Sequence, residues 1–386
     1  MKLVYIATDP ITAYRLMDGQ LGYMQRQGFE VTVITAPGPL LEQAAEREGV
    51  RAVAVPMTRE LSPLADALAL ARLTTQLHRI RPTIVNAGTP KAGLLGVMAA
   101  RLAGVPIVVY LLRGLRFEGA SGFKRLLLAA TEHVAGGLAH RVFVNSESLR
   151  ARATALACVA PDKAWVPGAG SSNGVDIDRF ASTPERVAFG RAERRRLGLV
   201  DDALVIGFVG RFVRDKGIVE LVEAFRIASE REPRLRLLLV GDHDATDPLP
   251  PATRDFLAQD PRVRGTGFVK EPARYYSAMD LFVFPSYREG FPNAPLEAAA
   301  AGLAVVAFRA TGTVDAVIDG VTGKLVTERS GQALASALLD YARQPELARA
   351  HGAAGAERAK RNFRQELVWS ALAQEYRRLA ATLPSR

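Results

Sequence analysis

The chain has 386 residues, which is long for one hydrophobic core and enough for two domains of ordinary size. Its 48% hydrophobic and 23% charged residues are typical of a globular protein, and no long uncharged apolar run predicts a membrane-spanning helix. The net charge of +10 is spread along the chain, which disfavours nucleic-acid binding. An anionic membrane surface, phosphorylated substrates or a solvated arginine-rich surface would each explain it.

The start of the chain and its cysteine content indicate a compartment. The opening MKLVYIATDP has one lysine and a strand-like run without a cleavage site, so no signal peptide is expected. The single cysteine, Cys158, excludes an intramolecular disulfide and fits a reducing compartment. We therefore expect a cytoplasmic protein.

Short apolar, β-branched runs alternate with helix-length amphipathic segments through the first half of the chain. Apolar residues within 61–80 recur near helical spacing, and Pro82 ends that helix. Strands separated by helices predict a parallel sheet that is covered on both faces. The predicted strands are residues 2–8, 30–35, 51–57, 83–88, 107–112 and 141–146.

The same alternation starts again in the second half. The predicted strands there are residues 204–210, 234–241, 263–269, 281–286, 304–308 and 323–326. The predicted helices are residues 216–230, 271–278, 294–301, 312–318 and 331–343. The fold class is therefore α/β, with two doubly wound, Rossmann-like parallel-sheet domains facing a central cleft, where open sheets bind ligands.

The boundary between the two domains lies in a Gly/Ser/Asn/Asp-rich segment, residues 170–182, which is suited to a linker. The predicted domains are residues 1–178 and 179–363. A last helix, within about 364–386, is expected to pack back on the first domain.

Two cations follow the first strand of the second domain. GFVGRFVRDKG (207–217) ends that strand at Gly210 and places Arg211 and Lys216 at its carboxyl end, without the spacing of a P-loop. A guanidinium and an ammonium there can clamp a diphosphate and neutralise the charge of a leaving group. The alternative is a pair of solvated surface cations.

Two carboxylates follow a later strand of the same domain. SYREGFPNAPLEAAAAG (286–302) carries Glu289 in a loop and Glu297 inside a helix, with Asn293 as the expected N-cap and Pro295 in the first turn. The loop carboxylate can accept hydrogen bonds from sugar hydroxyls, and the helical carboxylate can hold a ribose diol. The backbone between them can bind hydroxyls or phosphate oxygens. The alternative is a capping carboxylate and an ordinary helical glutamate.

These motifs together resemble a known family. GRFVRDKG, followed by PSYREGFPNAPLEAAAAGLAVVAF and GKLV, resembles the retaining family-4 glycosyltransferases of the GT-B fold, whose E-x7-E motif the two glutamates match. The resemblance covers essentially the whole chain. The segments GTPKAGLLGVMAARLAGVP, LRGLRFEG and GSSNGVD are similar to the branch that builds capsular polysaccharide, O-antigen and glycan-lipid intermediates.

The resemblance implies a metal-independent, retaining hexosyltransferase without a cofactor. It would move a sugar from a UDP- or GDP-sugar to a glycan or polyprenyl-diphosphate-linked saccharide in surface polysaccharide biosynthesis. The first domain would bind the acceptor and the second the donor. The implied catalytic residues are Arg211, Lys216 and Glu289. The implied donor-binding residues are Gly210, Arg211, Lys216, Val269, Glu289, Gly290, Phe291, Pro292, Asn293 and Glu297. The acceptor-side candidates are Arg59, Lys91 and Arg113.

One feature of the family is absent. Many members have a histidine beside the reacting sugar, after the strand that corresponds to 107–112, and this chain has Arg113 there. No histidine lies in a matching place, so no catalytic histidine is assigned. Arg113 either binds a phosphate of the donor or the acceptor, or it forms a salt bridge. The front-face displacement drawn for this family needs no protein nucleophile, so the loss of the histidine is tolerable.

Two further patterns have competing interpretations. Asp176-x-Asp178 and Asp242-x-Asp244 have the D-x-D spacing of a metal site, but both lie outside the expected site, so no metal is expected. Residues 112–128 join four cations to two phenylalanines and a leucine run. They form either an interfacial helix on an anionic membrane or a core-packing helix with snorkelling cations.

Three other functions remain as alternatives. A GT-B sugar-nucleotide epimerase or hydrolase would share the donor site, and a non-catalytic partner subunit would share the fold. An oxidoreductase is disfavoured because no G-x-G-x-x-G follows the first strand.

Overall fold

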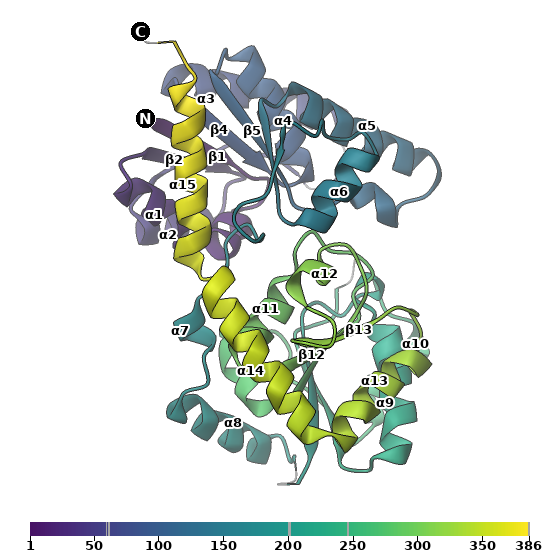
Figure 1. The fold of residues 1–386 in the computed structure, drawn as a ribbon. Helices are drawn as coiled ribbons and strands as arrows, with labels where there is room; N and C mark the ends of the chain where they lie inside the picture. Colours follow the sequence, from purple (N-terminus) through teal and green to yellow (C-terminus); the bar gives the residue numbers. More distant parts are fainter. Residues whose placement is uncertain (59, 61, 200–201, 245–246, 385–386) are drawn as a thin grey trace. The chain divides into compact units, whose positions relative to one another are not determined.

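The protein forms two compact units, as the computed structural model shows for residues 1–58, 60, 62–199, 202–244 and 247–384 (Figure 1). The first unit consists of Met1–Gly174 and Gln365–Arg386, and the second of Val175–Arg364. The sequence predicts the first boundary at residue 178, four residues later. The structure places it earlier because Val175 already belongs to the second unit, where its N–H donates to the carbonyl of Phe363 over 2.7 Å.

The first unit is built on a seven-stranded, fully parallel sheet in the order β3-β2-β1-β4-β5-β6-β7. Its strands are β1 (Lys2–Ile6), β2 (Glu30–Thr35), β3 (Arg51–Ala54), β4 (Ile84–Gly88), β5 (Ile107–Leu112), β6 (Arg141–Val144) and β7 (Ala164–Trp165). Its α-helices are α1 (Gln20–Arg26), α2 (Pro39–Glu48), α3 (Pro63–Ile80), α4 (Pro90–Leu102), α5 (Gly122–Leu138), α6 (Glu147–Ala155) and α15 (Gln365–Ala381). A π-helix, η1 (Thr12–Leu16), and a 3-10 helix, η2 (Arg116–Gly119), complete it.

Side chains of the central strands alternate between two hydrophobic cores, one on each face of this sheet. In β1, Val4 and Ile6 enter one core, whereas Leu3 and Tyr5 enter the other. Because helices cover both faces of the sheet, consecutive residues of each central strand are buried, and the sequence of these strands is a continuous apolar run. The predicted doubly wound fold of this unit is confirmed.

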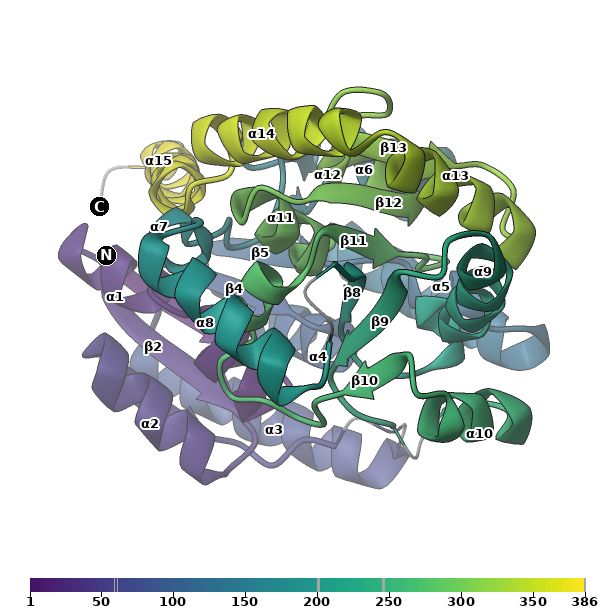
Figure 2. The same ribbon diagram turned by 90° about the horizontal axis from the view of Figure 1, so that it is seen from below.

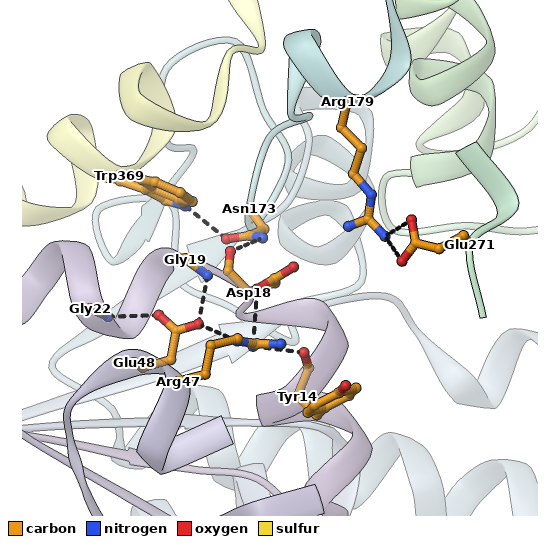
Figure 3. A network of polar contacts seen from close by, with 10 residues as sticks. All are labelled: Tyr14, Asp18, Gly19, Gly22, Arg47, Glu48, Asn173, Arg179, Glu271 and Trp369. Carbon is orange, nitrogen blue, oxygen red and sulfur yellow. Dashed lines mark hydrogen bonds and ion pairs between the residues drawn. The ribbon is translucent and has the colours of Figure 1, made fainter. Parts of the chain in front are cut away.

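The last helix, α15, completes the second core of the first unit. Its Trp369 Nε1 donates to Asn173 Oδ1 over 2.7 Å (Figure 3). Tyr376 is fully buried between Phe29 and Phe143. The Trp369 indole lies against Gly19, where an added Cβ would approach the ring to 2.5 Å. Because Gly19 also has φ +77°, only glycine fits this turn.

The entry into α1 is held by a buried carboxylate. Glu48, at the end of α2, accepts hydrogen bonds from the backbone N–H groups of Gly19 and Gly22, each over 2.9 Å (Figure 3). Arg47 donates to the same carboxylate over 3.0 Å. The carboxylate therefore satisfies the orphan donors of a helix start whose N-cap, Gly19, has no side chain.

The second unit has a six-stranded, fully parallel sheet in the order β10-β9-β8-β11-β12-β13 (Figure 2). Its strands are β8 (Leu204–Val209), β9 (Leu235–Val240), β10 (Val263–Gly265), β11 (Leu281–Phe284), β12 (Ala304–Phe308) and β13 (Gly323–Val326). Its α-helices are α7 (Ile177–Phe180), α8 (Pro184–Arg196), α9 (Ile218–Arg231), α10 (Pro251–Gln259), α11 (Asn293–Ala300), α12 (Thr313–Ala316), α13 (Gly331–Arg343) and α14 (Pro345–Asn362). Two 3-10 helices are η3 (Arg214–Lys216) and η4 (Pro272–Ala278).

Every predicted strand of the second half is present, so the second doubly wound domain is also confirmed. The order of its strands reverses between β8 and β11, which are direct neighbours. No helix formed by the described residues combines the length and apolar character needed to cross a membrane.

A buried acid lies in the first unit, inside the core. Glu132 of α5 is 5% exposed and accepts a hydrogen bond from the Tyr110 hydroxyl over 2.6 Å. Burial raises the pKa of Glu132 from 4.5 to about 7. The native chain therefore binds more protons than the unfolded chain between these two values, and its stability falls as the pH rises through that window.

We predict that Glu132→Gln removes this pH dependence while keeping an acceptor for Tyr110. Between pH 5 and pH 8, the wild type should lose about 1–3 kcal/mol more unfolding free energy than Glu132→Gln, because one pKa unit corresponds to about 1.4 kcal/mol. Urea unfolding at both pH values measures the difference. Glu147→Gln, at a side chain that is 57% exposed, is the control. Parallel stability curves for wild type and Glu132→Gln would contradict the prediction.

Candidate active site

The strongest candidate site lies in the second unit, where the strand order reverses. β8 and β11 are neighbours there, and the chain leaves their carboxyl ends toward opposite halves of the sheet. Such a reversal opens a crevice in which open α/β sheets bind ligands. The loop after β8 carries Arg211 and Lys216, and the loop after β11 carries Glu289.

The structure brings Lys216 and Glu289 into direct contact. Lys216 Nζ forms an ion pair with Glu289 Oε1, and the two side chains are only 23% and 15% exposed. The hydroxyl of Ser286 donates to the same oxygen over 2.7 Å. The Glu289 carboxylate is thus held by two donors in the loops that follow β8 and β11. Ser286 was not predicted from the sequence, although it lies in the same motif.

A glycine permits the two loops to approach each other. Gly217, which follows Lys216, has φ +70°, and a Cβ added there would lie 2.0 Å from the carbonyl oxygen of Pro285. A backbone hydrogen bond also joins the two loops: the N–H of Tyr287 donates to the carbonyl of Asp215 over 3.0 Å. Any side chain at Gly217 would push the loops apart and separate the ion pair.

Arg211 pairs with a residue of the loop after β9 rather than with Glu289. Its side chain is 65% exposed and is paired with Asp244. Asp242 of the same D-x-D accepts a hydrogen bond from the N–H of His243 over 2.7 Å. Asp244 of the second D-x-D therefore pairs with Arg211, and the sequence did not predict this contact.

Glu297 lies in α11 with one dedicated partner. The hydroxyl of Tyr276, a side chain that is 1% exposed, donates to Glu297 Oε2 over 2.7 Å. Burial raises the pKa of Glu297, although the Tyr276 hydrogen bond and the charge of Arg179 oppose the shift. Arg179 itself binds Glu271 through two hydrogen bonds (Figure 3). Tyr276 is a second site residue that sequence reasoning missed, because η4 carries no motif.

The start of α11 differs from the prediction. Asn293 is the first helical residue, and Pro292, which has extended backbone angles, is the N-cap without a side-chain hydrogen bond. The proline ring fixes φ near its observed −80°, which is compatible with the non-helical cap position. Phe291 is 7% exposed and packs on Phe363, so its side chain belongs to the core. Gly290 lies in the loop that joins Glu289 to this cap.

The remaining predicted residues have other surroundings. Val269 is half-buried and packs against the core of the second unit, after β10. Lys91 is 8% exposed and paired with Asp66 over 2.7 Å, so its charge is already compensated inside the first unit. Arg113 follows β5. Arg59 lies outside the described residues.

The first D-x-D also has a local partner. Asp176 Oδ1 accepts a hydrogen bond from the N–H of Arg179 and caps α7. Across the described ranges, no group of three or more His, Cys, Asp or Glu side chains is arranged to hold a metal ion.

Comparisons with known proteins show the family to which the chain belongs. Residues 18–168 match the family described as "Glycosyl transferase 4-like domain", and residues 203–344 match "Glycosyl transferases group 1". The chain is 33% identical to the capsular polysaccharide biosynthesis glycosyltransferase CapM of Staphylococcus aureus over 361 residues, covering 94% of this chain and 93% of CapM. The chain belongs to the group 1 glycosyltransferases.

Two further proteins extend the comparison. An Escherichia coli UDP-Gal:α-D-GlcNAc-diphosphoundecaprenol α-1,3-galactosyltransferase is 27% identical, with 81% of this chain and 80% of that protein covered. The crystal structure of Anabaena Alr3699/HepE in complex with UDP-glucose superposes with a TM-score of 0.81 and 22% identity, covering 98% of this chain and 100% of that one. The glycosyltransferase therefore has the predicted GT-B fold, built from two Rossmann-like domains.

We predict that Gly217→Ala disrupts the candidate site of this glycosyltransferase. The added Cβ cannot be placed beside Pro285, so the free energy of unfolding should fall by about 2–4 kcal/mol, and stabilisation by nucleotides should be lost. Gly320→Ala is the matched control, because Gly320 has a similar φ of +71° but open space around its Cβ position. Thermal unfolding with and without UDP measures both effects. Equal losses in the two variants would show that backbone conformation alone, rather than the loop contact, is responsible.

Proposed function

We propose that this glycosyltransferase moves a hexosyl group from a UDP- or GDP-sugar, with retention of configuration, to a glycan or lipid-linked saccharide in surface polysaccharide biosynthesis. The observation that carries the proposal is the Lys216–Glu289 ion pair between the loops that follow the neighbouring strands β8 and β11. The similarity to CapM supports the pathway. The donor and acceptor named for the E. coli relative, and the UDP-glucose bound by HepE, support the substrate classes.

The proposed donor site uses the charges on the two loops. Lys216 and Arg211 bind the diphosphate. On binding, each cation leaves the carboxylate with which it is paired in the structure and contacts the diphosphate instead. Glu289, once released from Lys216 and still bound by Ser286, accepts hydrogen bonds from the sugar hydroxyls. Glu297 holds the ribose diol, with Tyr276 fixing its second oxygen.

The proposed reaction is a front-face displacement. The bond between the anomeric carbon and the diphosphate oxygen breaks, and the acceptor oxygen bonds to that carbon on the same face of the sugar. The acceptor hydroxyl proton passes to the leaving diphosphate. Lys216 and Arg211 stabilise the charge that develops on that leaving group, so the proposed mechanism needs neither a protein nucleophile nor a metal.

Peripheral membrane attachment through α5 is part of the proposal. The first turns of α5 are exposed, with Phe123 and Leu126 at 80% and 70%, and they carry Lys124 and Arg125. Only the later part of the helix, around Ala135, is buried. Apolar side chains flanked by cations favour the interface of an anionic membrane, where a lipid-linked acceptor would lie.

We predict that Lys216→Ala and Glu289→Ala each lower kcat by about 10²–10³, because each removes a group that contacts the donor in the transition state. Transfer from a panel of UDP- and GDP-sugars, followed by product analysis, measures the effect and separates transfer from epimerisation or hydrolysis. Lys324→Ala, which breaks the Lys324–Asp340 pair in the same unit, should leave kcat within about twofold. EDTA should leave the wild-type rate unchanged. Full activity in both site variants would exclude the assigned site.

We predict that Phe123→Ser with Leu126→Ser weakens binding to vesicles that contain phosphatidylglycerol by at least roughly tenfold, because two exposed apolar side chains are lost. Leu64→Ser, on α3 of the same unit and 84% exposed, should leave binding unchanged. Co-sedimentation with phosphatidylglycerol and with pure phosphatidylcholine vesicles measures both. If the wild type does not co-sediment with the phosphatidylglycerol vesicles, the proposed membrane attachment is wrong.

A further inference from the structure

At the carboxyl edge of the first unit's sheet lies a cation that has no counter-charge among the residues that the structure describes. Arg113 directly follows β5, and its Nε is buried without a hydrogen-bond partner. Across residues 1–58, 60, 62–199, 202–244 and 247–384, Arg113 makes no hydrogen bond or ion pair through its other nitrogens either. The salt-bridge interpretation of this residue is therefore wrong for the described part of the chain.

Acidic residues along the same stretch of chain are engaged elsewhere. Glu118 pairs with Arg152 over 2.7 Å, and Glu147 pairs with Arg150 over 2.6 Å. Glu132 accepts the hydrogen bond of a tyrosine. Burial lowers the pKa of Arg113 to about 10 with no compensating acid, and the group still carries its charge at neutral pH. Arg113 is half-buried, and its buried Nε has no partner among the described residues. A buried donor without a partner is costly, so we expect a ligand to supply the anion.

A second unpartnered polar group lies on the neighbouring strand end. Asn145 directly follows β6, is 5% exposed, and has a buried Oδ1 without a partner among the described residues. β5 and β6 pair in parallel with Leu112 opposite Val144, and the N–H of Asn145 donates to the carbonyl of Leu112 over 3.3 Å. Arg113 and Asn145 therefore leave the sheet side by side.

The surroundings of this pair favour an anion. α4 and α6 begin directly after β4 and β6, the two strands that flank β5, so two helix N-termini lie at the same edge of the sheet. Their dipoles add positive potential beside Arg113. Asn145 Oδ1 accepts hydrogen bonds, which a hydroxyl can donate and a fully ionised phosphate cannot. A ligand that combines a phosphate with an adjacent hydroxyl would therefore satisfy both groups.

We propose that Arg113 and Asn145 bind the phosphate-bearing end of the acceptor, with Arg113 on the phosphate and Asn145 on a hydroxyl of the adjoining sugar. This assignment rests on the proposed function and specifies its acceptor as a phosphate- or diphosphate-linked saccharide. Its rival is the diphosphate of the donor, which has the same chemistry. The two sources are distinguished by separate titrations.

The first experiment titrates the full-length chain with inorganic pyrophosphate and follows thermal unfolding. A Lys216→Ala background removes the lysine of the donor site. Pyrophosphate should stabilise Lys216→Ala and should bind at least tenfold more weakly to Lys216→Ala with Arg113→Gln. Adding Arg150→Gln instead should change nothing, because Arg150 is already paired with Glu147. Absent or unchanged pyrophosphate binding would overturn the anion site.

The second experiment titrates UDP and GDP into the Arg113→Gln variant with Lys216 intact. Nucleotide affinity should stay within twofold of the wild type. A tenfold loss would assign the phosphate to the donor and overturn the acceptor assignment. If no nucleotide binds the wild type, the proposed function fails at its donor site, while the pyrophosphate result still decides whether Arg113 binds an anion.

Two variants separate binding from a structural role. Arg113→Gln should unfold at the same or a higher temperature than the wild type, because it removes a half-buried cation whose Nε has no partner among the described residues; a structural cation would give a lower temperature. Asn145→Asp should supply the missing partner, raising the unfolding temperature and abolishing pyrophosphate binding. An unfolding temperature lowered by both variants would contradict the side-by-side placement and the proposal.

Discussion

The contact between Lys216 and Glu289 is the interaction on which the candidate site depends. It joins the loops after β8 and β11, the two neighbouring strands at which the sheet of the second unit reverses its order. The contact exists because Gly217 lets one loop approach the backbone of the other closely enough to exclude a Cβ. Ser286 then fixes the carboxylate from within its own loop. The sheet topology therefore places the charges, and a single backbone conformation keeps them together.

The two units differ in whether the polar groups of their candidate sites have partners. In the second unit, Lys216, Glu289 and Glu297 all have partners, which a donor could exchange for its diphosphate and hydroxyls. In the first unit, Arg113 and Asn145 each keep a buried polar atom that has no partner among the described residues, at one edge of the sheet. Unsatisfied buried groups cost stability, and both atoms lie where parallel sheets bind ligands. This contrast is the physical basis for the proposal that the first unit binds a phosphate-bearing acceptor.

Elements with strong periodicity or β-branched runs could be predicted, and those without them could not. The twelve predicted strands are all present, but β7 has only two residues and escaped prediction. Helices α8 and α14 are rich in arginine, glutamate and alanine with weak apolar periodicity, so neither was predicted. The expected N-cap, Asn293, is one residue into α11, because local propensity alone does not decide which of two adjacent residues takes the extended cap conformation.

By itself the sequence determined the two parallel sheets, the loops that carry the charges, and the family, because alternation of apolar runs and motif spacing are local properties of the chain. Only the tertiary structure decided which charges meet. Lys216 contacts Glu289, Arg211 contacts Asp244, and Tyr276 contacts Glu297, although these partners are far apart in sequence. It also decided that Lys91 is neutralised by Asp66 while Arg113 has no partner in the described chain. Ion pairing and desolvation depend on through-space neighbours, which strand order and register create and which no spacing along the chain reveals.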